Sequence, residues 1–172
     1  MTRQFLLFAL LLASATPGRA AEPSDVLAGR SKHCPGCALA DANLKRFDLK
    51  QADFAGANLA GANLTGANLN KSDLKRVNLA GARLGEAMLY KADLSRADVS
   101  RADLAGAMMG SSHLIFAALD GANLADADLA DAEMHGVRLK GADLSRADLS
   151  QTTLRRADLE AADLEAASLA RR

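Results

Sequence analysis

The chain has 172 residues, of which 49% are hydrophobic, but it contains only one Tyr, five Phe and no Trp, so its apolar residues are mostly Ala and Leu. This length is enough for one domain, and the composition excludes a conventional core of large aromatic side chains. Lys and Arg number 21, as do Asp and Glu, and removing residues 1–20 with Arg3 and Arg19 leaves a net charge of about −2, which excludes the general polyanion binding of DNA-binding proteins.

Residues 1–20 have the organisation of an export signal. Arg3 provides a positive start, an apolar run extends from Phe5 to Ala15, and small residues flank Arg19 at a cleavage site. About eleven apolar residues are too few to cross a bilayer, which argues against the alternative of an N-terminal membrane anchor. We therefore expect residues 1–20 to be a signal peptide and the protein to be exported, periplasmic or secreted, with no transmembrane segment in the mature chain.

Residues 21–33 precede the regular part of the sequence. Ser24 and Asp25 stand directly before Val26 and Leu27, a pattern that predicts the start of a short helix. Such a helix would cap the repetitive region at residues 34–172, because the end of a repeat structure needs a cover for its apolar cross-section.

A large apolar residue stands at every fifth position from Leu39 to Leu169, and Ala usually stands two positions earlier. Leu fills 23 of these 27 positions, and Ala fills 20 of the 27 earlier ones. In an α-helix such leucines would be about 140° apart and would spread around the whole circumference. In a flat strand an odd period would send alternate leucines to opposite faces. The backbone must therefore turn a corner once in every five residues, so that both series point inward.

A chain that turns so regularly forms coils. Coils that stack about 4.8 Å apart pair their backbone groups as neighbouring strands do. Gly stands two residues after the large residue at positions such as 56, 61, 66 and 81, which predicts turns with positive φ. Other pentads have Lys, Arg, Asp or Glu there, and for these we expect a turn type that accepts any residue.

The pentads resemble the consensus A(D/N)LXX of the pentapeptide repeat family, most literally at residues 57–59, 62–64 and 142–144, and the resemblance covers residues 37–169. It implies an all-β fold, a right-handed quadrilateral β-helix with four pentads in each coil and about seven coils. Similar residues that recur twenty positions apart agree with a coil of that length: Lys71 and Lys91, Arg76 and Arg96, Met88 and Met108.

The first pentad contains the two cysteines. Continued backwards, the repeat places Cys34 at a large inward position and Cys37 at a small one, with Pro35-Gly36 between them as a type II turn. The Cα atoms flanking such a turn lie less than about 7 Å apart, which permits a disulfide. The alternatives are two buried thiols, or a redox or metal site, for which the helix N-terminus or further ligands are missing. We favour the disulfide and expect no metal and no cofactor.

Residues 107–118 depart most from the repeat and are expected to mark a surface. Stacking at twenty-residue intervals would expose several large apolar side chains together at one corner. The candidate interaction surface comprises Met88, Tyr90, Arg96, Met108, His113, Ile115, Phe116 and His135. An exposed apolar cluster rimmed by charge is typical of a partner-binding surface. The alternative is that drift of the repeat left a few apolar residues outside without a function.

Charge is also unevenly placed along the chain. Five cations are expected to share one face: Lys75, Arg76, Arg96, Arg155 and Arg156. A solvated surface that keeps the protein soluble is the alternative to a binding role. The repeat continues to the last residues, so we expect the final coil either to fray or to meet a second copy in a homodimer through the C-terminal end.

No catalytic arrangement is evident. No Ser or Cys stands beside a His as nucleophile and base, and no Gly-rich phosphate loop precedes a helix. The sequence therefore predicts a non-enzymatic exported scaffold that binds another macromolecule, with protein as the expected partner and no nucleic acid. The alternatives are a passive structural or stress protein of the envelope, and a DNA mimic like some members of the resembled family, which the leader and the nearly balanced charge disfavour.

Overall fold

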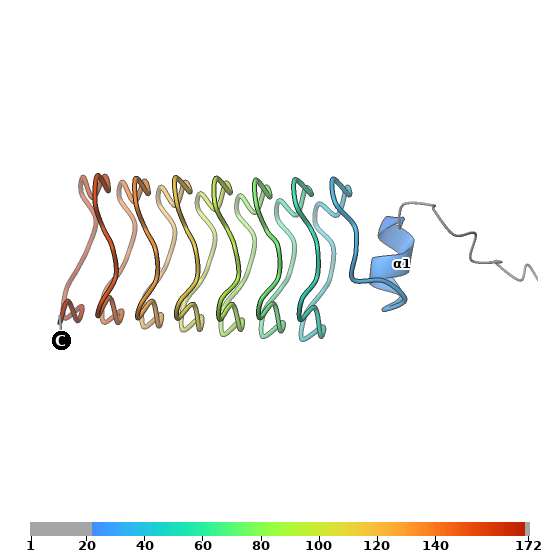
Figure 1. Ribbon diagram of the computed structural model, residues 1–172, viewed down its shortest axis with the longest axis horizontal. Coiled ribbons are helices and arrows are strands. Elements are labelled where there is room, and N and C mark those ends of the chain that lie inside the picture. Colours follow the sequence, from blue (N-terminus) through green and yellow to red (C-terminus); the bar gives the residue numbers. More distant parts are fainter. Residues whose placement is uncertain (1–21, 171–172) are drawn as a thin grey trace, which may run out of the picture.

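The computed structural model describes residues 22–170, so the predicted signal peptide at residues 1–20 lies outside the described residues. Figure 1 shows a rod of stacked coils, with one short helix, α1 (Pro23–Leu27), at the N-terminal end. The β structure consists of isolated parallel bridges, one residue in each pentad, and contains no longer strand within these residues. In the same part of the chain no helix is long and apolar enough to cross a membrane.

Every bridge joins residues twenty positions apart, so one coil contains four pentads and has four faces. Face 1 contains the bridge residues from His33 to Thr153 in steps of twenty, and faces 2, 3 and 4 contain those that start at Ala38, Asn43 and Asp48. Each corner is numbered here after the face that precedes it, so corner 1 begins with Pro35-Gly36 and continues with Ala55-Gly56, and corner 4 begins with Lys50-Gln51. The predicted coil of twenty residues is confirmed.

All corners use the same turn. At every corner from Gly36 to Ala166 the second residue has φ between 53° and 70°, and eighteen of these residues are not Gly. The N–H of that residue donates to the carbonyl oxygen one coil further on, as from Arg76 to Ser95 at 3.0 Å. A type I turn would flip the peptide between the two corner residues, and its N–H and carbonyl oxygen would then miss their hydrogen-bond partners in the neighbouring coils. The prediction of a second turn type at the non-Gly corners is therefore wrong, because stacking imposes the left-handed conformation on any side chain.

The interior contains the two series of inward residues that the period predicts. The large residues from Leu39 to Leu149 are at most 2% exposed, and most small ones, such as Ala62 and Ala87, are fully buried. Each inner leucine therefore stacks on those of the coils before and after it. In the final coil the same positions are only partly covered, and Leu169 is 56% exposed.

Helix α1 covers the N-terminal end of the coils. Its Val26 is fully buried and belongs to the same core as the inner leucines. The N-cap residue is Glu22, and Ser24 and Asp25 lie inside the helix. The sequence therefore predicted the helix but placed its start two residues late. Asp25 accounts for the shift, because its carboxylate accepts a hydrogen bond from the Glu22 N–H at 3.3 Å and pairs with Arg30 at 2.8 Å.

A disulfide joins Cys34 to Cys37 across the first corner, where the Cα atoms are 5.4 Å apart. The turn is the predicted one, with Gly36 at φ 70° and a hydrogen bond from the Cys37 N–H to the Cys34 carbonyl at 3.2 Å. Cys34 is fully buried and Cys37 is 8% exposed. The pair thus replaces a Leu and an Ala of the core and closes the corner that lies beside α1.

Ser112 occupies a small inward position that Ala fills in most pentads. It is fully buried, and its Oγ has no hydrogen-bond partner among the described residues. A buried hydroxyl without a partner costs about 1–3 kcal/mol, so we expect Ser112→Ala to raise the free energy of unfolding by about 1 kcal/mol. Ser72→Ala is the matched control, because Ser72 Oγ donates to the Leu69 carbonyl at 2.7 Å and its loss brings no gain. Urea unfolding checks both variants, and a less stable Ser112→Ala protein would contradict the expectation.

Candidate interaction surface

The structure distributes the predicted surface over two neighbouring corners. Met88 and Met108 lie on face 4, and Tyr90 lies at corner 4 directly after it. Arg96, Ile115, Phe116 and His135 lie at corner 1, and His113 lies on face 1 between the two corners. The side chains therefore extend from face 4 across corner 4 and face 1 to corner 1. They do not meet at a single corner, as the sequence had suggested, because residues five positions apart turn to the next face of the coil.

Three large apolar side chains on this surface are well exposed. The exposed fractions are 44% for Tyr90, 45% for Met108 and 53% for Phe116, whereas Met88 and Ile115 are half-buried. The Tyr90 ring has Lys91 Nζ 5.1 Å from its centroid, a cation–π contact. Phe116 meets His135 edge to face, with the ring centroids 5.3 Å apart.

The Phe116 ring lies over the backbone of Gly136 in the next coil. A Cβ added at Gly136 would lie 2.5 Å from Cδ1 and Cε1 of that ring, which is too close for a real contact. Other long corner side chains extend in the same direction, toward a Gly twenty residues on, as Arg46 does toward Gly66. The absence of a side chain at residue 136 therefore lets the phenyl ring rest on the rod beside His135.

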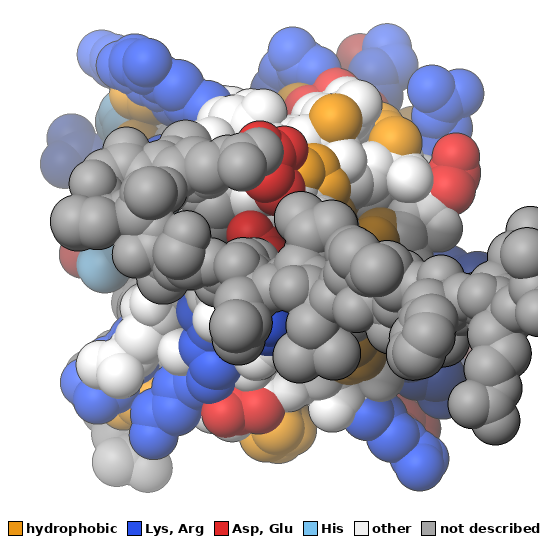
Figure 2. All heavy atoms as spheres, turned by 90° about the vertical axis from the view of Figure 1, so that its right-hand side faces the viewer, with side chains coloured by type: hydrophobic (Ala, Val, Ile, Leu, Met, Phe, Trp, Pro, Cys, Tyr) orange, Lys and Arg blue, Asp and Glu red, His pale blue; other side chains and the backbone are white. Residues whose placement is uncertain are grey.

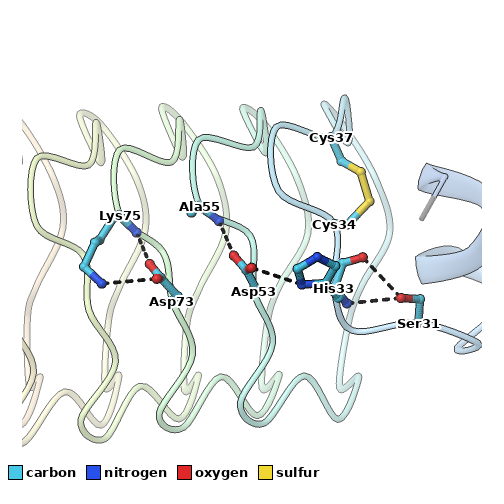
Figure 3. A network of polar contacts seen from close by, with 8 residues as sticks. All are labelled: Ser31, His33, Cys34, Cys37, Asp53, Ala55, Asp73 and Lys75. Atoms are coloured by element: carbon cyan, nitrogen blue, oxygen red, sulfur yellow. Dashed lines mark hydrogen bonds and ion pairs between the residues drawn. A yellow bond between two sulfur atoms is a disulfide. The ribbon is translucent and has the colours of Figure 1, made fainter. Parts of the chain in front are cut away.

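Face 1 is acidic at its centre, but its carboxylates are largely engaged. Lys75 Nζ lies 3.1 Å from Asp73 and 3.1 Å from Asp93, and these hydrogen bonds raise the pKa of Lys75. Burial raises the pKa of Asp93, but hydrogen bonds from Ser95 and Lys75 together lower it below its ordinary value. His33 lies 3.0 Å from Asp53 (Figure 3).

Corner 1 is the basic edge of this face. All five cations that the sequence placed on one face lie here: Lys75, Arg76, Arg96, Arg155 and Arg156. A hollow of about 470 Å³ runs along the corner and is lined by Ala55, Gly56, Lys75, Arg76, Ser95 and Arg96. Viewed along the rod, Lys and Arg side chains project from the outer edges of the cross-section (Figure 2).

The Asp or Asn at the bridge position of most pentads is a turn residue, as its outward place in the repeat indicates. Its side-chain oxygen accepts a hydrogen bond from the N–H two residues on, as Asp53 does from Ala55 and Asp73 from Lys75, both at 3.1 Å (Figure 3). That N–H does not take part in the ladder between coils, so the side chain satisfies a donor that has no backbone partner. The signal was present in the consensus, which alternates only Asp and Asn at this position.

This role makes part of the stability dependent on pH. Hydrogen bonds from Ser145 lower the pKa of Asp143, and those from Ser150 lower the pKa of Asp148. Because these carboxylates have a lower pKa in the folded state, their ionised forms stabilise it, and the stabilisation is complete above pH 3.8, the ordinary pKa. The stabilisation is lost as the pH falls through the lowered pKa. We expect Asp143→Asn with Asp148→Asn, which keeps both acceptors, to make the midpoint of thermal unfolding fall less steeply below pH 3.8 than in the unaltered protein. Equal slopes in calorimetry from pH 5 downward would contradict this assignment.

The residue types of a hydrolytic triad occur together at Ser31, His33 and Asp53, but not in a catalytic geometry. Ser31 Oγ contacts the backbone of His33, accepting from its N–H at 3.1 Å and donating to its carbonyl at 3.2 Å (Figure 3). The hydroxyl thus has no hydrogen bond to the imidazole, which a general base requires. Within residues 22–170 no three His, Cys, Asp or Glu side chains are placed to hold a metal ion.

Comparison with known proteins identifies the repeat. Residues 36–70, 67–106, 111–146 and 139–171 match the family described as pentapeptide repeats, in eight copies. No curated protein matches the chain at a significant level.

Solved structures of repeat proteins also match. One is HetL of the cyanobacterium Nostoc sp. strain PCC 7120, a pentapeptide repeat protein involved in heterocyst differentiation regulation, at 34% identity over 79% of this chain and 71% of HetL, with a TM-score of 0.46. Another is a pentapeptide repeat protein of the Arabidopsis thaliana thylakoid lumen, at 27% identity over 56% of this chain and 70% of that one, with a TM-score of 0.47. A third is the plasmid-mediated fluoroquinolone resistance protein QnrB1, at 23% identity over 80% and 73%, with a TM-score of 0.46.

Proposed function

The chain belongs to the pentapeptide repeat family, and from this premise we propose that it is a non-enzymatic scaffold that binds a protein partner through face 1 and its two bordering corners. The observation that carries the proposal is the exposure of Tyr90 and Phe116 at the two corners that border face 1, with exposed Met108 on the adjoining face 4. Exposed apolar side chains grouped on one side and rimmed by charge favour a protein contact over bare solvation.

The architecture supports a role for the outer surface alone. Two residues of each pentad fill the interior, the bridge residue between them faces outward and the fourth and fifth residues form the corner. The residue type can therefore vary freely between pentads only at the bridge positions, which face solvent, and at the corners. This favours recognition by a rigid surface.

The proposal places the protein outside the cytoplasm, in the periplasm or secreted, after removal of residues 1–20, and takes the rod as a right-handed quadrilateral β-helix. The Cys34–Cys37 disulfide suits an oxidising compartment. Mass spectrometry of the protein isolated from its native compartment, with and without reductant, tests both parts, because free thiols or an uncleaved leader would argue against export.

A photo-crosslinking residue at position 90 tests the scaffold function. We expect one dominant adduct when the Tyr90 variant is expressed in the source organism and irradiated. The matched control carries the same residue at Asp103, which is exposed on face 3, on the opposite side of the coil. An adduct confined to position 90 supports the proposal, whereas no adduct at either position favours the passive structural or stress role.

Homodimerisation through the C-terminal coil stays a prediction of the proposal. Leu154, Leu159 and Leu164 are partly covered there, and Leu169 is largely exposed. Sedimentation equilibrium of the protein measures the association, and Leu164→Lys should weaken it if this end is the interface.

A further inference from the structure

We propose that corner 1, from Gly56 to Arg156, binds an extended acidic segment of the partner, with an apolar residue at the centre of that segment. The inference deepens the proposed function and rests on it. It names the chemistry of the partner and assigns the contact to a column of corner residues that runs along the rod axis.

Charge is the first argument. Among the four corners, corner 1 alone has no carboxylate at its turn positions within the described residues from 55 to 156. Over the same coils the other corners include Asp120 at corner 2, Glu86 and Asp126 at corner 3, and Asp131 at corner 4. Corner 1 instead has four guanidinium groups, none of which pairs with a carboxylate of the described residues: Arg76, Arg96, Arg155 and Arg156.

Several cations elsewhere on the rod pair with a carboxylate of a neighbouring coil, whereas others, such as Arg46 and Arg101, have no ion pair among the described residues. Arg138 pairs with Asp120 at 2.6 Å, and Arg146 pairs with Asp126 at 2.7 Å. Lys75 is the paired cation of corner 1, held by Asp73 and Asp93. Because corner 1 has no carboxylate at its turn positions from 55 to 156, its four arginines are a local excess of positive charge on a protein whose overall charge is nearly balanced. Arginine favours carboxylate partners because its planar fork binds both oxygens.

Backbone amides supply the second and independent argument. In the first half of corner 1 the N–H groups of Ala55, Lys75 and Ser95 donate to aspartates of face 1, at 3.0–3.1 Å. In the second half those aspartates are replaced by His113, Glu133 and Thr153.

As a result, the N–H groups of Ile115, His135 and Arg155 find no acceptor within residues 22–170. Glu133 does not replace the missing aspartate, because its carboxylate lies toward His113, at 4.0 Å. A carboxylate supplied by a ligand would meet these donors where Asp93 meets the Ser95 N–H one coil earlier.

Shape and spacing select a polypeptide. Coils lie about 4.8 Å apart, so Arg96 and Arg156, three coils apart, are separated by about 14 Å, the length of about four residues of an extended chain. Between them lie Ile115 and the exposed Phe116, which require an apolar side chain, while the hollow beside Arg76 and Arg96 accepts an acidic one. A polypeptide supplies acidic and apolar side chains within this distance, whereas a nucleic acid or a sulfated glycan supplies charge at every unit.

Fluorescence anisotropy with a labelled peptide tests the inference on the purified protein. The probe is a peptide about nine residues long, enough to span the column, that alternates glutamate with serine around a central leucine–phenylalanine pair. We expect saturable binding that falls about tenfold or more in Arg76→Gln with Arg96→Gln, because two charge-assisted contacts are lost. Arg46→Gln with Arg101→Gln is the matched control, since these arginines occupy the same turn position at corners 3 and 2, away from face 1.

The outcomes separate the possibilities. Equal losses in the two double variants would show attraction to cations anywhere on the rod, and equal binding of a peptide with glutamine for glutamate would show that its charge is not recognised. Either result would overturn the inference. Stronger binding of single-stranded DNA or dextran sulfate at corner 1 would overturn it as well. Arg155→Gln with Arg156→Gln provides a second test at the far end of the column, and unfolding curves confirm that each variant is folded. If the adduct from position 90 persists unchanged in Arg76→Gln with Arg96→Gln, the inference fails while the scaffold function stands.

Discussion

Leu104→Asp is expected to prevent the protein from folding into a soluble rod. Leu104 is fully buried and stacks between Leu84 and Leu124, which are fully buried as well. Truncation of such a leucine to Ala costs about 2–5 kcal/mol, and a carboxylate costs more because nothing inside the coil pairs with it. A domain with an ordinary stability of about 5–15 kcal/mol does not tolerate this loss.

Circular dichroism and thermal unfolding of the soluble fraction measure the effect. Met108→Asp is the matched control, because it also replaces an apolar residue with aspartate but at an exposed bridge position, where Asp is common in other pentads. We expect that variant to fold and to retain its unfolding midpoint. An unaltered midpoint for Leu104→Asp would instead reject the inward assignment of the large series.

The fold was predictable because its cause is local and repeated. A period of five is incompatible with a helix stripe and with a flat strand, so the corner at each pentad followed from geometry alone. The coil of twenty residues came from the family resemblance, and the bridges confirm it. The disulfide was favoured over buried thiols because the phase of the repeat brings Cys34 and Cys37 to the two sides of one turn, where their Cα atoms are 5.4 Å apart.

The turn type was not predictable from single-residue preference. Lys71 and Arg76 have φ of 58° and 53°, although a left-handed residue with a Cβ costs about 1–2 kcal/mol. The conformational preference of Lys or Arg taken alone therefore favours a turn without a positive φ. The ladder between coils overrides it, since one flipped peptide would leave donors and acceptors unpaired in two coils, and this effect appears only once the coils are stacked.

The candidate surface was partly predictable for a related reason. The stacking of like positions, such as Met88 and Met108, followed from the twenty-residue coil, and so did the grouping of the five corner 1 cations. The division between two corners was missed because the chain turns between Met108 and Ile115. The free amides at Ile115 and His135 were missed as well, although the loss of Asp or Asn at residues 113 and 133 was a visible signal.

Gly136→Ala is expected to cost more stability than the same change at Gly141. Both glycines have nearly the same φ, 65° and 64°, and nothing lies within 4 Å of a Cβ at Gly141. Gly141→Ala therefore measures the cost of a left-handed alanine, about 1–2 kcal/mol. At Gly136 the new methyl group also collides with the Phe116 ring, and displacing or straining it adds about 1–3 kcal/mol.

Urea unfolding of a double-mutant cycle separates the two costs. In the background of Phe116→Ala, the change Gly136→Ala should cost no more than Gly141→Ala, because the colliding ring is gone. If the extra cost persists without the ring, the collision is not its cause. If Gly136→Ala costs no more than Gly141→Ala even with the ring present, Phe116 can move off the rod at little cost. Binding of the acidic peptide to the Gly136→Ala variant then reports whether recognition needs the ring beside His135. A ring that must rest on Gly136 links the stability of this turn to the recognition proposed for corner 1.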